Sequence, residues 1–189
     1  MYETSSSLML ALECQVDGKV WQEFVDVYQP FLRYLFRQGG IPASDLEDIV
    51  QDAFLKLWRL WSNGFQRDKG RGRLRGFLRV LVRNQIVDWF RKRRWQEQSL
   101  SSVPETAVSS EASFELLHRS HVLRTAMAAI RLQCRASTWA CFERHTVQQV
   151  AAEEVARDLG ISVNAVYINS SRVLARVRDF CQQYGESLS

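Results

Sequence analysis

Apolar side chains recur every three to four residues along most of the chain, a period that predicts amphipathic α-helices rather than strands. A first helix is predicted over residues 19–38. Its apolar stripe consists of Trp21, Phe24, Tyr28, Phe31, Leu32 and Leu35. Pro30 is expected to kink this helix or to open a second one, because proline lacks the backbone donor of a helix interior. Gly39-Gly40 and Pro42 then end the block.

A second helix is predicted from Ser44-Asp45-Leu46-Glu47 to about residue 61. These four residues have the pattern of a capping box, in which the serine accepts from the first-turn backbone and the glutamate reaches back. The face opposite the apolar stripe is polar and carries Asp45, Asp48, Gln51, Asp52 and Lys56. A solvated surface is the ordinary explanation of such a face.

A third helix is predicted over residues 74–95, after a basic loop at residues 65–72. Its apolar stripe consists of Phe77, Leu78, Leu81, Val82, Ile86 and Trp89. Arg75, Arg79 and Arg83 follow one another at four-residue steps and form a cationic row beside that stripe. The helix closes on the run Arg91-Lys92-Arg93-Arg94.

Residues 96–113 differ sharply from both flanks, since they contain six serines and three glutamates but no lysine or arginine. This composition is typical of a flexible linker. It divides the chain into a first helical domain at residues 1–95 and a second at residues 114–189. The predicted fold class is therefore all-α, with two small helical domains joined by a flexible linker.

The second domain is predicted to begin with a helix over residues 114–134, with Leu116, Leu123, Met127 and Ile130 as its stripe. A short helix around residues 138–145 and two further helices at residues 150–159 and 162–184 follow. In the last pair, Ala156 is small where two helices would cross, and Gly160 suits the positive backbone angle of a sharp turn. This spacing predicts a helix-turn-helix, with an ordinary helical hairpin as the alternative.

The second helix of that motif would expose several side chains able to contact DNA, namely Asn164, Tyr167, Ser171, Arg172 and Arg176. Asparagine pairs with adenine, arginine pairs with guanine or holds phosphate, and a serine hydroxyl holds phosphate.

Composition narrows the class of protein further. The 189 residues are 46% hydrophobic and 24% charged, which excludes a wholly disordered or collagen-like chain. No apolar run approaches the roughly 20 residues of a membrane span, and the N-terminus lacks the positive charge of a secretory signal. The four cysteines form no CxxC pair, so we expect reduced thiols and a cytoplasmic protein without membrane insertion.

Positive charge is concentrated in one segment. Residues 67–94 hold eleven Lys and Arg against two Asp, a net charge of +9, whereas the rest of the chain sums to −5. Such a separation indicates a polyanionic partner. Aromatic residues within or beside the segment, among them Phe90 and Trp95, could stack on unpaired bases.

Nothing in the sequence supports an enzyme or a cofactor, because it has no P-loop, GxSxG, HExxH or Rossmann glycine pattern. The weakest alternative is a metal site. It would use His118 and His121 with Cys134, Cys141 and His145 downstream, at spacings that match no structural zinc pattern. No metal is therefore expected.

The order of these features resembles bacterial RNA polymerase sigma factors of the small, two-domain extracytoplasmic-function (ECF) type. Asp45 to Trp58 is similar to the part of region 2 that docks on the clamp helices of core polymerase, and Gly76 to Arg93 is similar to the part that opens and reads the −10 element. Residues 114–184 resemble region 4, which reads the −35 element. One departure is that family members often carry Lys or Arg near Asn169-Ser170, where this chain has neither.

The resemblance implies a role for each set of residues. Contacts to core polymerase would come from Asp45, Asp48, Gln51, Asp52, Phe54 and Lys56. Contacts to −10 DNA, duplex and single-stranded, would come from Lys69, Arg71, Arg73, Arg79, Arg83, Asn84, Arg91 and Arg94. Contacts to the −35 element would come from Asn164, Tyr167, Ser171, Arg172 and Arg176.

The resemblance also implies that the second domain meets the polymerase flap and that an anti-sigma factor is a candidate partner. Two alternatives stay open from the residues themselves. One is a stand-alone helix-turn-helix regulator that binds duplex DNA without polymerase, and the other is a metal-dependent enzyme that uses the His and Cys set.

Overall fold

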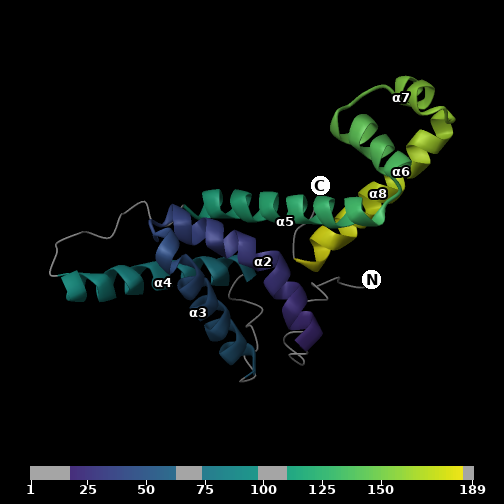
Figure 1. Cartoon of the computed structure of the whole chain (residues 1–189). Coiled ribbons are helices and arrows are strands. Elements are labelled where there is room, and N and C mark those ends of the chain that lie inside the picture. Colours follow the sequence, from purple (N-terminus) through teal and green to yellow (C-terminus); the bar gives the residue numbers. More distant parts are fainter. Residues whose placement is uncertain (1–17, 63–73, 98–109, 185–189) are drawn as a thin grey trace. The chain divides into compact units, whose positions relative to one another are not determined.

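The computed structural model of the protein describes residues 18–62, 74–97 and 110–184, and within these ranges it contains helices and turns but no strand. The all-α prediction is confirmed (Figure 1). The described residues fall into two compact units, one ending at His121 and the other beginning at Val122. No helix in these ranges is long and apolar enough to cross a membrane.

The first unit is built on three helices, α2 (Gly18–Gln38), α3 (Ala43–Ser62) and α4 (Leu74–Glu97). The largest fully buried side chains of this core are Phe24, Tyr28, Leu32, Phe36, Leu57, Leu78 and Ile86. At one end of the α2–α3 contact, Trp21 and Phe24 of α2 meet Trp61 of α3 at ring centroid distances of 5.9 and 5.1 Å. This burial holds the helices together because each large aromatic side chain removes 150–250 Å² from water, at about 25 cal/mol per Å².

Of the two outcomes expected at Pro30, the opening of a second helix does not occur, because α2 continues through this residue, with Phe24 and Phe36 on either side packed in one core. One local prediction is wrong. The capping box does not form, since the Ser44 hydroxyl donates to Asp45 Oδ1 at 2.6 Å. Glu47 instead accepts from Arg33 Nε of α2 at 2.7 Å, a charge-assisted pair stronger than a neutral cap.

The fourth helix, α5 (Glu111–Gln133), begins within the predicted linker, where Ser110 Oγ accepts from the backbone N–H of Ser113 at 3.3 Å. Its first half packs on α2. His121 Nε2 donates to the carbonyl of Val27 at 2.7 Å, and His118 Nε2 lies 3.0 Å from the hydroxyl of Tyr28. The boundary between the units therefore differs from the expected division at residue 113, because these apolar and hydrogen-bonding contacts attach residues 111–121 to the first unit.

The buried stripe of α5 also differs from the prediction. Leu116 is 63% exposed, whereas Phe114 is buried against Phe31 of α2 at a ring centroid distance of 5.7 Å. His118 and His121 supply the next turns of the buried face instead of a metal site. Within the described ranges no group of three or more His, Cys, Asp or Glu could hold a metal ion. The residues between α4 and α5 that carry most of the predicted linker, 98–109, lie outside the described part.

The second unit contains α6 (Ala136–Cys141), the π-helix η2 (Phe142–Val147), α7 (Ala152–Leu159) and α8 (Val163–Gln183). The turn between α7 and α8 has the predicted geometry, because Gly160 adopts φ 65° and Ser162 Oγ accepts from the Ala165 N–H at 3.2 Å. Val155 and Val166 are fully buried between the two helices. The helix-turn-helix is thus built as the spacing predicts, on the support of α6 and η2 (Figure 1).

Replacing Phe114 or Leu116 by alanine distinguishes the observed stripe of α5 from the predicted one. Phe114→Ala is expected to lower the free energy of unfolding by about 3 kcal/mol, since it empties a packed site. Leu116→Ala, on the same helix, is expected to cost less than about 0.5 kcal/mol. Urea unfolding followed by circular dichroism measures both. Equal losses would contradict the packing of α5 on α2.

Candidate functional site

A groove of about 370 Å³ lies between α3 and α4, and we call it the α3/α4 groove. The α3 wall comprises Asp45, Asp48, Ile49, Asp52, Leu55, Lys56 and Arg59, and the α4 wall comprises Gln85, Asp88, Trp89 and Lys92. The residues of each wall recur at three- and four-residue steps, so each wall is one face of one helix. The sequence-predicted acidic face of α3 is therefore one side of a groove.

One end of the groove is held by a network around Asp45. The indole Nε1 of Trp89 donates to Asp45 Oδ2 at 3.0 Å, and the guanidinium of Arg93 lies over the Trp89 ring, 5.0 Å from its centroid. Arg93 also approaches Asp45 Oδ2 at 4.0 Å. The Ser44 hydroxyl, and then Trp89 and Arg93, lower the pKa of Asp45 below its ordinary value of 3.8. Asp45 thus joins α3 to α4 as a carboxylate.

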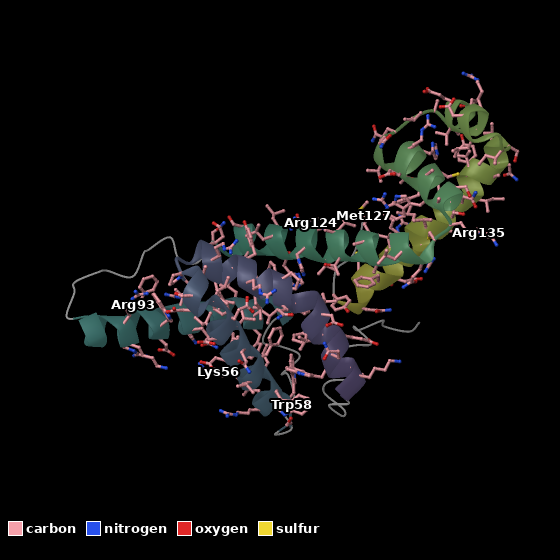
Figure 2. The ribbon with its side chains drawn as sticks, viewed as in Figure 1. Lys56, Trp58, Arg93, Arg124, Met127 and Arg135 are labelled. Atoms are coloured by element: carbon pink, nitrogen blue, oxygen red, sulfur yellow. The ribbon has the colours of Figure 1, made fainter. Side chains whose placement is uncertain are left out.

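The middle of the groove carries groups without partners. Asp48, Asp52 and Lys56 line the groove, are exposed and have no hydrogen bond or ion pair within the described residues; Figure 2 labels Lys56 on α3. Gln51 is also exposed on α3, but it does not line the groove. On the opposite wall Gln85 is only 5% exposed, and its Nε2 has no hydrogen-bond partner in the same part of the chain. A buried amide without a partner costs about 1–3 kcal/mol. The groove is therefore suited to a partner that is both charged and hydrogen bonding.

Phe54, which the resemblance assigns to the core-polymerase contact, does not line this groove. The side chain is 8% exposed, and its ring meets those of Trp21 and Phe24 edge-on at 6.0 and 6.3 Å. It belongs to the core between α2 and α3, on the side of α3 away from the groove face. Gln85 was not among the predicted site residues. The sequence pattern does indicate its burial, since it lies seven residues after Leu78, on the buried side of the helix.

Apart from Arg94, the residues predicted to contact −10 DNA fall into three groups: those exposed without a partner among the described residues, those paired with an acidic residue, and those outside the described residues. Arg83 and Asn84 are exposed on α4 without a partner in the described ranges, whereas Arg91 is paired with Asp88. Arg79 lies 3.6 Å from Glu111 of α5, and its Nε is buried. Arg94 lies in the last turns of α4. Lys69, Arg71 and Arg73 lie outside the described residues.

The aromatic residues near this cationic face are also divided. Phe90 is half-buried, and its Cζ lies 3.4 Å from the place where a Cβ at Gly40 would stand. Its ring meets that of Trp89 edge-on at a centroid distance of 4.9 Å. Phe90 therefore packs near the turn between α2 and α3 rather than projecting as a stacking surface. Arg83 and Asn84 remain the free polar groups of the described face of α4.

The exposed face of α8 shows a similar division. Asn164, Tyr167 and Arg172 are exposed, and the ring of Tyr167 lies edge-on to His145 at 5.1 Å. The Ser171 hydroxyl donates to the carbonyl of Ile168 at 3.0 Å. Arg176 donates to the Gln133 side chain and to Cys134 Sγ, so its guanidinium is held at the end of α5. Of the five predicted residues, three have side chains without such bonds.

Comparison with known proteins finds a match within the first unit. Residues 24–96 match a family model described as sigma-70 region 2. This range begins in α2, includes all of α3 and ends in α4, and it therefore contains every described wall residue of the α3/α4 groove. The match includes both segments whose resemblance to region 2 is noted above, Asp45 to Trp58 and Gly76 to Arg93. A search of curated protein sequences finds no match.

Two solved structures are similar at low sequence identity. CnrH, in complex with the cytosolic domain of CnrY, is 19% identical, with 93% of this chain and 95% of that chain covered and a TM-score of 0.38. The sigma factor RpoE in complex with the anti-sigma factor NepR from Bartonella quintana is 18% identical, with 87% and 98% covered and a TM-score of 0.36.

The network at the end of the groove predicts a pH response. Because its pKa is lowered in the folded protein, Asp45 stabilises the fold above its ordinary value of 3.8, and this contribution is lost as pH falls through the lower, folded value. Ser44→Ala is expected to raise the pKa of Asp45 most, and Trp89→Phe less. Carboxyl ¹³C shifts followed by NMR between pH 2 and 6 measure it. A pKa of Asp45 that neither substitution changes would contradict the network.

Proposed function

We propose, from the match of residues 24–96 to the model of sigma-70 region 2, that this protein is an ECF-type sigma factor that binds core RNA polymerase and directs initiation at promoters with −35 and −10 elements. The observation that carries the proposal is the family match over α2 to α4. The positions of the polar side chains that are unpaired among the described residues also support it. Asp48 and Asp52 lie in the α3/α4 groove, and Arg83 and Asn84 lie on the cationic face of α4, so a protein and a DNA strand could each be bound. No catalytic group is proposed, and the proposed function implies a cytoplasmic protein, because transcription initiation takes place there.

The α3/α4 groove is the proposed contact to the clamp helices of core polymerase. Asp48 and Asp52 are one helical turn apart and unpaired within the described part, so they attract basic side chains of a partner helix. Gln85 offers a hydrogen bond beside them once its terminal amide turns toward the groove. Asp45 contributes differently, because its bond to Trp89 holds the two walls in register.

The cationic face of α4 is the proposed contact to −10 DNA. Arg83 and Asn84 are the described residues there whose side chains are free to meet a phosphate or a base. Extruding a base from the duplex costs a few kcal/mol of lost stacking, which cationic contacts must offset. Lys69, Arg71 and Arg73 are also proposed to contact −10 DNA, because their segment is strongly positive. Arg94 is included because it lies in α4.

The helix-turn-helix of the second unit is the proposed reader of the −35 element and the unit that meets the polymerase flap. Asn164, Tyr167 and Arg172 present the free side chains of its recognition helix α8. Ser171 and Arg176 would have to leave their present partners before they could hold phosphate. An anti-sigma factor remains part of the proposal as an expectation of the resemblance.

A stand-alone helix-turn-helix regulator is the second candidate, and the geometry of α7 and α8 favours it equally. It leaves the α3/α4 groove and the region 2 match without a role. Run-off transcription with bacterial core polymerase, on a promoter upstream of the protein's own gene, separates the two. A start site that needs both the chain and the core supports the sigma factor, and specific duplex binding by the chain alone, without a transcript, supports the regulator.

Charge reversal in the groove tests the proposed polymerase contact. Asp52→Lys is expected to weaken binding to core polymerase at least about tenfold, because a cation would then face the basic side chains of the partner. Glu23→Lys makes the same charge change at an exposed position of α2 and is the matched control. Fluorescence anisotropy of labelled chain titrated with core measures both. Equal affinities of the two variants would contradict docking in the groove.

Removal of one free cation tests the proposed −10 contact. Arg83→Ala is expected to reduce open-complex formation at low salt and to lower the slope of log K against log salt by about 0.7, the value for one phosphate of a single strand. Arg178→Ala removes an exposed arginine of α8 and is the control. Permanganate reactivity of unpaired thymines, followed over a salt series, reports the effect. An unchanged slope for Arg83→Ala would exclude a phosphate contact at this residue.

A further inference from the structure

The exposed face of α8 carries two large apolar side chains in succession, Tyr167 at 50% exposed and Ile168 at 40% exposed. The core of the unit does not require them, because Val166, Val173 and Val177 already form the buried stripe of this helix and are each 1% exposed or less. A single exposed apolar residue is common on protein surfaces. Two adjacent exposed apolar residues, on the face expected to enter a DNA groove, indicate that this face binds a partner.

The polar side chains of the same face differ in whether they are free to hydrogen bond to a base. The Ser171 hydroxyl is bonded to the carbonyl of Ile168, so it offers no free donor to a base. Asn164 and Arg172 are exposed and have no hydrogen bond or ion pair among the residues described. The ring of Tyr167 is held edge-on by His145 at 5.1 Å, which limits its rotation. The face therefore presents Asn164, then an apolar pair, then Arg172.

The major groove offers an apolar group on one base alone, the C5-methyl of thymine. Asparagine pairs with adenine and arginine with guanine on the same edge. Asn164 and Arg172 are eight residues apart, which is about 12 Å along a helix and spans about three to four base pairs at 3.4 Å each. A thymine methyl within that span would meet the apolar pair.

We propose that Tyr167 and Ile168 read thymine methyl groups in the upstream promoter element, between the bases contacted by Asn164 and Arg172. The inference rests on the proposed function, since it takes α8 as the recognition helix, and it adds the base chemistry that this helix selects. The element bound by this protein then contains at least one thymine whose methyl, rather than its hydrogen-bonding atoms, determines affinity.

Replacement of thymine by deoxyuridine tests this directly, because deoxyuridine removes the methyl and leaves every hydrogen-bonding atom of the base in place. The full chain with core polymerase first selects its upstream element from a randomised promoter library. Each thymine of the selected element is then replaced singly by deoxyuridine, and holoenzyme binding is measured by competition. At one or two positions, binding is expected to weaken about fourfold, the value of one buried methyl group.

Alanine variants assign the effect to the apolar pair. Ile168→Ala and Tyr167→Ala are expected to bind the thymine element more weakly and to lose discrimination between thymine and deoxyuridine at the sensitive position. Leu132→Ala removes an aliphatic side chain that is 89% exposed at the end of α5 and is expected to keep the discrimination. Circular dichroism confirms that each variant is folded.

The outcomes separate this inference from the function on which it rests. If the holoenzyme selects an element but no deoxyuridine weakens binding, or if both alanine variants still discriminate, the inference is wrong and the sigma factor function stands. If the chain with core selects no element and starts no transcript, the proposed function fails and the inference fails with it.

Discussion

The packing of α2 on α3 through aromatic side chains determines which face of α3 remains for a partner. Trp21 and Phe24 meet Phe54 and Trp61 at ring centroid distances between 5.1 and 6.3 Å, and this contact places one side of α3 in the core. A helix repeats every 3.6 residues, so burial of these positions turns Asp48 and Asp52 to the other side. The polar wall of the groove is thus a consequence of aromatic burial.

The second wall depends on the first. Leu78, Val82 and Ile86 bury one side of α4, which leaves Gln85, Trp89 and Lys92 beside α3 and Arg83 and Asn84 exposed. One helix therefore serves two surfaces of different chemistry, a groove shared with acidic α3 and a cationic face. The bond from Trp89 to Asp45 keeps the groove wall in place without using the residues that face solvent. The proposed function uses this division, because it assigns the groove to the polymerase and the cationic face to a DNA strand.

The helices and the turn at Gly160 could be predicted from the sequence. The helices follow from the three- to four-residue period of apolar residues, and the turn follows from the positive φ that glycine adopts easily. It did not predict the partners of Glu47 or Arg176, because Arg33 and Gln133 reach them through tertiary packing. Phe54 did have a signal in the sequence, since it lies on the apolar side of its helix with Leu57 and Trp61, and only the resemblance assigned it to the polymerase contact. The sequence predicted Leu116 in the stripe of α5, whereas the contact with Phe31 of another helix buries Phe114 instead.

The most direct test of the central claim compares two affinities of the same full-length chain, one for core RNA polymerase and one for a promoter duplex without polymerase. We expect tight binding to the core and specific promoter binding only when the core is present. Tight, sequence-specific binding of the duplex by the chain alone, together with no binding to the core, would contradict it and leave the α3/α4 groove without its proposed partner.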